Sequence, residues 1–148
     1  MTDSHALPTP LPGSPSIPSF AHARVRDARH RGVITCLPDT PMEAVARIMT
    51  TNHVHAVVVA GLGGVRPWGV VTDRDLLAVA PEAADRVAGS CATTDLVSVA
   101  PDERLEVAAE RMREQSVSHL LVVDPELNVP VGMLSTLDIA EIVAWGRG

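Results

Sequence analysis

The 148-residue sequence predicts an α+β fold in which two β-α-β-β-α repeats pack sheet to sheet about a pseudo-twofold axis. One observation behind this prediction is an internal duplication, because GVVTDRDL at 69–76 returns 63 residues later as GMLSTLDI at 132–139. The same offset, without a gap, superimposes Pro38 on Pro101, Asp39 on Asp102, Glu43 on Glu106, Met49 on Met112, Val54 on Val117 and Pro67 on Pro130. A single copy of roughly 60 residues buries its own sheet poorly, so we expect the two sheets to cover each other.

The composition indicates an aliphatic core and argues against a nucleic-acid partner. Apolar residues make up 46% of the chain and aromatic residues only 2%, so stacking platforms for single-stranded nucleic acid are scarce. The formal net charge is −6, whereas affinity for nucleic acid depends largely on Lys and Arg that neutralise phosphates. We therefore expect no DNA or RNA partner.

Cysteine usage and hydropathy predict a soluble, cytoplasmic protein. Cys36 and Cys91 lie in apolar surroundings without Cys-x-x-Cys or Cys/His ligand spacing, which is typical of buried, reduced thiols, although a disulfide between them stays open. No apolar run approaches the roughly 20 residues that a membrane-spanning helix needs. The first residues also lack a basic segment followed by an apolar one, so we expect no membrane partner.

The N-terminal part of the chain divides into a tail and a basic cluster. Residues 1–23 contain five prolines among Ser, Thr and Gly, and we expect a disordered, extended tail there. Arginines follow at Arg24, Arg26, Arg29 and Arg31. These side chains belong either to a solvated helix or linker, or to a positive lip beside an anion site.

The first repeat is expected at residues 24–84. It begins with a strand over Val33–Cys36, and the next helix is predicted to have Thr40 as its N-cap, Pro41 at its first position and Glu43 completing a capping box. The apolar face of this helix is formed by Met42, Val45, Ile48 and Met49. The remaining expected elements are a strand at 54–60, a turn at 61–67, a strand at 68–72 and a helix from 73 to about 80.

The second repeat is expected at residues 85–148 with the same order of elements. The predicted elements are a strand at 96–99, a helix from about 102 to 115, strands at 120–123 and 131–135, and a final helix through Trp145. Leu105, Ala108 and Met112 should face inward from the first of these helices. We expect the functional surface to lie between the two repeats.

A hydroxyl and a carboxylate stand three residues apart where a strand runs into a helix, and this occurs twice, as Thr72 with Asp75 and as Ser135 with Asp138. The start of a helix has backbone N–H groups without internal partners and so attracts anions, while a carboxylate one turn later can accept hydrogen bonds from two vicinal hydroxyls. Together these groups suit a ribose and its phosphate. The same residue types are also preferred as helix caps, so both interpretations stay open at this point.

The residues quoted above resemble a known family. Pro-Asp followed by an amphipathic helix, then VSHLLVVD, then GVVTDRDL, is similar to the CBS domain, and the duplication resembles a pair of CBS domains, or Bateman module. The resemblance covers about residues 24–145. It implies a regulatory module, usually a homodimer, that binds adenosine-containing ligands such as AMP, ADP, ATP or S-adenosylmethionine in clefts between the repeats and requires no further cofactor.

The resemblance also implies roles for particular residues. Asp75 and Asp138 would hold the ribose hydroxyls, and Thr72 and Ser135 would lie near ribose or phosphate. His119 matches a basic residue that often reaches phosphate, whereas the first repeat has Ala56 at that position, which suggests unequal sites. The expected ligand-binding set is Thr72, Arg74, Asp75, Ser135, Asp138 and His119.

Four functions compete. The leading expectation is a stand-alone, non-enzymatic sensor that signals to a separate effector protein, and the alternative is a ligand-free dimerisation or interaction module. A metalloenzyme using His53, His55 and His119 is disfavoured, because no Asp or Glu stands at a ligand-like spacing. Nucleophilic catalysis is disfavoured as well, since Cys36 and Ser135 have no adjacent His in the sequence.

Overall fold

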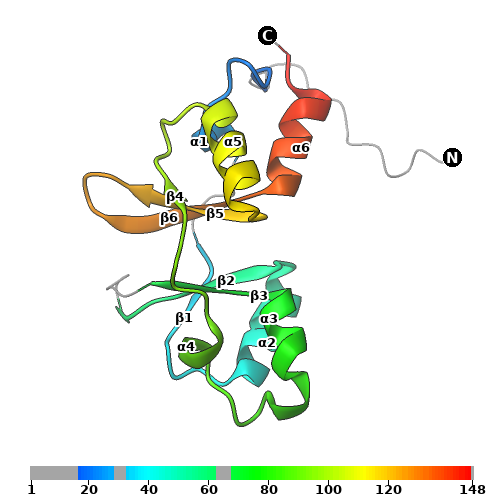
Figure 1. Ribbon diagram of the computed structural model, residues 1–148, viewed down its shortest axis with the longest axis vertical. Coiled ribbons are helices and arrows are strands. Elements are labelled where there is room, and N and C mark those ends of the chain that lie inside the picture. Colours follow the sequence, from blue (N-terminus) through cyan, green and yellow to red (C-terminus); the bar gives the residue numbers. More distant parts are fainter. Residues whose placement is uncertain (1–16, 29–32, 63–67, 148) are drawn as a thin grey trace, which may run out of the picture.

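The computed structural model describes residues 17–28, 33–62 and 68–147, and these form two similar α+β units stacked on each other (Figure 1). The first unit contains β1 (Thr35–Cys36), α2 (Met42–Asn52), β2 (Ala56–Val59), β3 (Gly69–Thr72), α3 (Asp73–Val79) and a 3-10 turn (Ala80–Glu82). The second contains β4 (Ser98–Val99), α5 (Leu105–Gln115), β5 (His119–Asp124), β6 (Val129–Ser135) and α6 (Thr136–Trp145). Two short helices, α1 (Val25–Ala28) and α4 (Ala88–Cys91), complete the fold. The predicted β-α-β-β-α order is confirmed in both units.

The two three-stranded sheets have the same topology. In each, the first strand pairs parallel to the second and the second pairs antiparallel to the third, in the orders β1-β2-β3 and β4-β5-β6. The register is also repeated, because Ala56 pairs with Thr72 and, 63 residues later, His119 pairs with Ser135. The second hairpin is longer and contains an irregularity between Val122 and Val123.

Each sheet has a helix-covered outer face, and the two inner faces meet (Figure 1). The buried residues of the first outer core are Cys36, Met42, Val45, Met49, Val57, Val59, Val71, Val79 and Ala88. The second outer core has buried residues 63 positions after the first eight of these, namely Val99, Leu105, Ala108, Met112, Leu120, Val122, Leu134 and Ile142. The counterpart of Ala88 is Val25, which stands 63 residues before it, and Ala23 is buried in this core as well. The duplication in sequence is therefore a duplication in packing.

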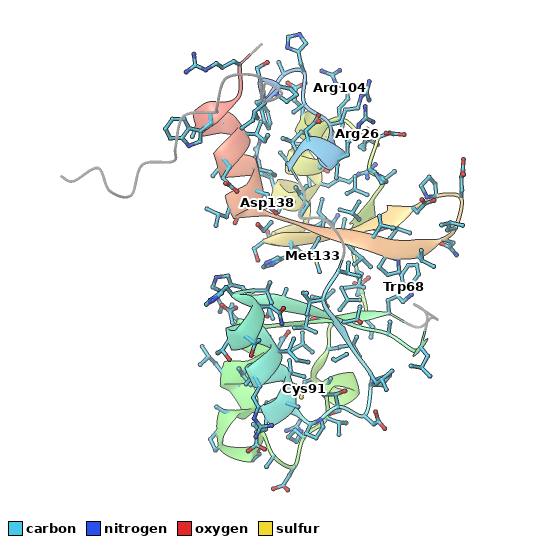
Figure 2. All side chains as sticks on the ribbon, turned by 180° about the vertical axis from the view of Figure 1, so that it is seen from behind. Arg26, Trp68, Cys91, Arg104, Met133 and Asp138 are labelled. Atoms are coloured by element: carbon cyan, nitrogen blue, oxygen red, sulfur yellow. The ribbon has the colours of Figure 1, made fainter. Side chains whose placement is uncertain are left out.

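The cluster between the sheets shows the predicted pseudo-twofold relationship. Val58 and Leu121 occupy equivalent positions of β2 and β5, are 1% and 2% exposed, and belong to the same buried cluster. Partly buried side chains around them come from both repeats, namely Val33, Trp68, Leu96, Val123 and Met133. Figure 2 shows Trp68 and Met133 at the level where the two sheets face each other. The expected packing of sheet on sheet is confirmed.

The short helices α1 and α4 cross between the repeats. The α1 residue Val25 is buried in the core of the second repeat, and its N–H donates to Glu103 O over 2.9 Å. The equivalent α4 residue, Ala88, is buried in the core of the first repeat, and its N–H donates to Thr40 O over 2.8 Å. Thus α1, which precedes the first repeat in the sequence, completes the core of the second, and α4, which precedes the second repeat, completes the core of the first.

The start of α2 differs from the predicted capping box. Pro41 rather than Thr40 is the N-cap, and no side chain caps the helix. Thr40 Oγ1 instead accepts a hydrogen bond from the N–H of Leu37 over 3.1 Å. The first helical N–H groups donate to backbone carbonyls of the segment before α4, from Met42 to Arg86 and from Glu43 to Ala83. A tertiary contact therefore satisfies donors that we expected a local side chain to satisfy.

The described residues before α1 differ from an extended tail. Ala23 is 2% exposed, and Phe20 packs against the core of the second repeat. Arg24 donates to the Asp102 carbonyl over 2.7 Å, and Arg26 forms an ion pair with the Asp102 carboxylate. Residues 1–16 of the expected tail, and Arg29 and Arg31 of the basic cluster, lie outside the described residues. In the described part of the chain, no helix has the length and apolarity to cross a membrane.

Candidate functional site

The first predicted pair forms the capping box of α3. Thr72 is the N-cap, and its N–H donates to Asp75 Oδ2 over 2.8 Å. Its hydroxyl donates to the same oxygen over 3.1 Å and accepts from the N–H of Asp75 over 3.4 Å. Asp75 is partly exposed. Its Oδ1 takes no part in these bonds.

The second pair repeats this geometry in a more buried position. Ser135 is the N-cap of α6, its N–H donates to Asp138 Oδ2 over 2.8 Å, and its Oγ accepts from the N–H of Asp138 over 3.2 Å. Asp138 is 1% exposed and is the buried charged residue among the described core positions. Figure 2 shows Asp138 where β6 passes into α6, close to the level at which the two repeats meet.

Backbone donors at both helix starts already have partners. The N–H of Asp73 donates to His55 O over 2.9 Å, and the equivalent N–H of Thr136 donates to Ser118 O over 3.1 Å. The N–H groups of Asp75 and Asp138 donate to the hydroxyls of their caps. Two of the first-turn donors that we expected to hold an anion are thus used within the protein at each helix start.

A cavity of about 200 Å³ lies between the repeats beside the first pair. Six apolar residues line it, namely Val70, Leu96, Val97, Val117, Leu121 and Met133. Four hydroxyl residues also line it, namely Thr72, Thr93, Ser116 and Ser118. Its two titratable residues are Asp95 and His119. The cavity therefore offers apolar walls to a flat ring and several neutral hydrogen-bonding groups.

The predicted site residues are distributed unequally around this cavity. Thr72 comes from the first repeat and His119 from the second, and both line it. Asp75, Ser135 and Asp138 are not among the residues that line it, although Asp75 is bonded to Thr72. Arg74 is exposed on α3 and is also absent from the lining.

Burial lowers the pKa of His119 from its ordinary value. The carboxylates of Asp73 and Asp138 act in the opposite direction by attraction, and His55 lowers the pKa further by repulsion. His55 Nδ1 also lies 3.1 Å from Asp73 Oδ2. His119 is therefore a partly buried imidazole whose neutral form is favoured, next to carboxylates from both repeats.

The described histidines do not form a metal centre. Within residues 17–28, 33–62 and 68–147, no group of three or more His, Cys, Asp or Glu side chains is arranged to hold a metal ion. His53 is exposed at the C-cap of α2, whereas His55 is hydrogen-bonded to Asp73. The two described cysteines are free thiols.

Sequence reasoning missed the segment that connects the repeats. Thr93 pairs with Val70 at the edge of the first sheet, through reciprocal N–H···O bonds of 2.9 Å. This brings residues 93–97 into the wall of the cavity. A Cβ atom at Gly69 would lie only 2.8 Å from Ala92 Cβ, so glycine at this position permits the close approach. The sequence signal for this close approach was Gly69, the first residue of the repeated motif.

Among known protein families, the model of the CBS domain matches residues 25–82 and 88–144. The CBS domain pair of protein MJ0100, in a complex with 5′-methylthioadenosine and S-adenosylmethionine, superimposes with a TM-score of 0.74 at 19% identity, over 82% of this chain and 96% of that one. The CBS domain protein PAE2072 of Pyrobaculum aerophilum, in complex with AMP, superimposes with a TM-score of 0.70 at 24% identity, over 82% and 98%. These likenesses concern the fold.

Curated relatives are much longer than the matched region. A homoserine O-acetyltransferase of Methanohalobium evestigatum is 27% identical over 125 residues, which are 84% of this chain and 25% of that protein. The chain spans about a quarter of the length of the curated relatives it matches. The similarity therefore concerns one region of those proteins.

Proposed function

Because the chain belongs to the CBS domain family, as two CBS repeats in tandem, we propose that it is a non-enzymatic regulatory module that binds an adenosine-containing ligand between its repeats. The observation that carries this proposal is the cavity lined by Thr72 from one repeat and His119 from the other. Its apolar walls suit an adenine ring, and its hydroxyls suit a sugar. Solved CBS proteins of the same fold were crystallised with 5′-methylthioadenosine, S-adenosylmethionine or AMP.

The proposed ligand contacts centre on the first pair. The Thr72 hydroxyl lines the cavity, and Asp75, bonded to it, keeps Oδ1 outside the capping bonds. Oδ1 would accept a hydrogen bond from a ribose hydroxyl. In the second repeat, Ser135 and Asp138 would do the same for a second ligand, after an opening of the more buried carboxylate. His119 would contact the remainder of the ligand, whereas Arg74, exposed on α3 and outside the lining, is assigned no contact.

The experiment is a thermal-unfolding series with AMP, ATP, 5′-methylthioadenosine and S-adenosylmethionine, with GMP as the matched control for the base. A ligand that binds only the folded state stabilises it by about 2.7 kcal/mol at a hundredfold excess over its Kd. This amounts to a rise in Tm of several degrees. An unchanged Tm with all adenosine compounds, confirmed by calorimetry, would remove the proposal.

The capping hydrogen bonds at the starts of α3 and α6 favour one alternative function, a ligand-free interaction module. Both hydroxyl–carboxylate pairs already act as complete capping boxes, so the helix starts are explained without any ligand. Asp75→Asn separates the two functions, because the amide keeps an oxygen that can accept from the Thr72 N–H but removes the charge that would grip a ribose. Weaker binding with an unchanged Tm supports the ligand site.

We further propose that the module is a homodimer formed through α3 and α6. Leu77 of α3 is 74% exposed, and Leu137 and Val143 of α6 are 66% and 64% exposed. The two helices lie on the same side of the molecule (Figure 1). Exposed apolar side chains gathered in this way are typical of protein contacts. Sedimentation velocity should give a dimer, and Leu137→Asp should give a monomer.

Signalling would follow from a change in how the repeats pack. A ligand that prefers one relative arrangement of the two sheets shifts the population toward it, and an effector protein that contacts both repeats would respond to that shift. The proposal requires that the ligand-free and ligand-bound states differ in solution. Small-angle scattering or hydrogen exchange across the sheet interface, with and without ligand, measures this difference.

A further inference from the structure

We propose that the cavity between the repeats selects adenosine ligands whose 5′ substituent is uncharged or positively charged, namely thioethers and sulfonium compounds, over phosphorylated adenosines. This inference rests on the proposed function and assigns the chemical class of its ligand.

The described part of the wall carries a negative charge and no fixed positive charge. Among the described residues that line it, Asp95 is the one carboxylate, and none is Arg or Lys. The remaining polar groups are four hydroxyls and the imidazole of His119. Selective phosphate binding uses Arg, Lys or several free N–H donors, because a phosphate that leaves water must regain strong hydrogen bonds and charge neutralisation.

Backbone donors do not replace the missing cations. At the start of α3, next to the cavity, the N–H of Asp73 donates to His55 O and the N–H of Asp75 donates to Thr72 Oγ1. The cap is itself made by the Asp75 carboxylate. A phosphate at this point would find these two donors already used and would meet the like charge of Asp75.

The field at His119 is set by carboxylates from both repeats. Asp73 and Asp138 attract its proton, and the nearby His55 lies within hydrogen-bonding distance of Asp73. Burial of the imidazole favours the neutral form. Neutral His119 offers one N–H donor and one acceptor nitrogen, of which Nδ1 lies 3.0 Å from Ser118 Oγ, and this form carries no positive charge to set against a phosphate.

Asp95 supplies the discriminating charge. It is exposed, in the segment that Thr93 holds against the edge of the first sheet. A sulfonium or an amino group on the 5′ side of the ligand would be attracted by it, and a phosphate would be repelled. Arg74, the nearest predicted cation in the motif, is exposed and outside the lining.

The test is isothermal titration of the full chain, at low salt and pH 7.5, with 5′-methylthioadenosine, S-adenosylmethionine, AMP and ATP. We expect the first two compounds to bind at least tenfold more tightly than AMP, and ATP to bind most weakly. Asp95→Asn should weaken S-adenosylmethionine severalfold and leave methylthioadenosine unchanged, and Asp95→Arg should strengthen AMP severalfold. Glu126→Gln, which removes one exposed charge on the β5–β6 hairpin, is the matched control and should change none of these affinities.

The outcomes separate this inference from the proposed function. AMP or ATP that binds as tightly as methylthioadenosine overturns the charge selection and leaves the adenosine site intact. Loss of AMP binding in the Arg74→Gln variant would also overturn the charge selection, because Arg74 would then supply the missing cation. Failure of all four compounds to bind refutes the proposed function and the inference together.

Discussion

Ser135 and Asp138 bond to each other twice across the first turn of α6, through the Ser135 N–H to Asp138 Oδ2 at 2.8 Å and the Asp138 N–H to Ser135 Oγ at 3.2 Å. Thr72 and Asp75 form the same reciprocal pair at α3. The copies differ in burial, because Asp138 is 1% exposed whereas Asp75 is partly exposed. The fold should therefore depend more strongly on the acid of the second repeat.

Asp138→Ala should lower the free energy of unfolding by about 1–2 kcal/mol and Asp75→Ala by about 0.5–1 kcal/mol, which is the usual range for the loss of a helix cap. The larger effect follows from burial, since water cannot replace the lost acceptor at position 138. Urea denaturation of both variants measures the difference. Asp138→Asn, which keeps an oxygen acceptor, is the control, and equal losses for the two alanine variants would contradict the ranking.

Val58 and Leu121 should couple the two repeats. Leu121→Ala should cost about 2–4 kcal/mol and Val58→Ala about 1–3 kcal/mol. Because both side chains are buried in one cluster, the double variant should deviate from the sum by at least about 0.5 kcal/mol. A double-mutant cycle measures this.

The neighbouring pair Val57 and Leu120 provides the control for that cycle. Both are fully buried, but they belong to separate cores beneath the helices of their own repeats. Their alanine variants should therefore be additive. Additivity at Val58 and Leu121 would show that the sheets do not support each other in solution.

His119 should make the protein less stable in weak acid. Its pKa in the folded state is lowered, chiefly by burial, so the unfolded chain binds the proton more readily. This contribution to stability is fully present above the unfolded pKa of about 6.5 and is lost as the pH falls through that value toward the lower folded pKa. Tm should fall less between pH 7.5 and 5.5 in His119→Gln than in the natural sequence. Parallel curves for the two proteins would contradict the prediction.

The Cys36 thiol should resist alkylation in the folded protein. Burial raises its pKa, although a hydrogen bond with Thr40 acts in the opposite direction, and the reactive thiolate is therefore scarce at neutral pH. Mass spectrometry after iodoacetamide at pH 7.5 should show no adduct on Cys36 until denaturant is added. Rapid native labelling of Cys36, as fast as that of the partly exposed Cys91, would show that the first core opens readily.

The duplication predicted the sheets because short runs of β-branched and other apolar residues repeat at one offset. It did not predict the exchange of α1 and α4, since each four-residue helix has one buried residue, Val25 or Ala88, and is too short to show periodicity. The cap of α2 was misplaced for a related reason, because the carbonyls of Arg86 and Ala83, in the segment before α4, accept from its first N–H groups.

Of the six residues expected to bind ligand, Thr72 and His119 line the cavity, whereas Arg74, Asp75, Ser135 and Asp138 do not. The contribution of residues 93–97 was not predictable, because an isolated bridge between Thr93 and Val70 leaves no pattern of alternation. The engagement of the helix-start donors also depends on distant carbonyls such as His55 O.

The reciprocal burial of Val25 and Ala88 makes the chain indivisible at its midpoint. A nick near residue 85 would yield two fragments, each carrying the piece that fills its sister's core. Such fragments should be able to reassemble with each other, but neither should persist by itself. Gain or loss of one repeat during evolution would leave the core of the other incomplete, so the two repeats should be inherited together.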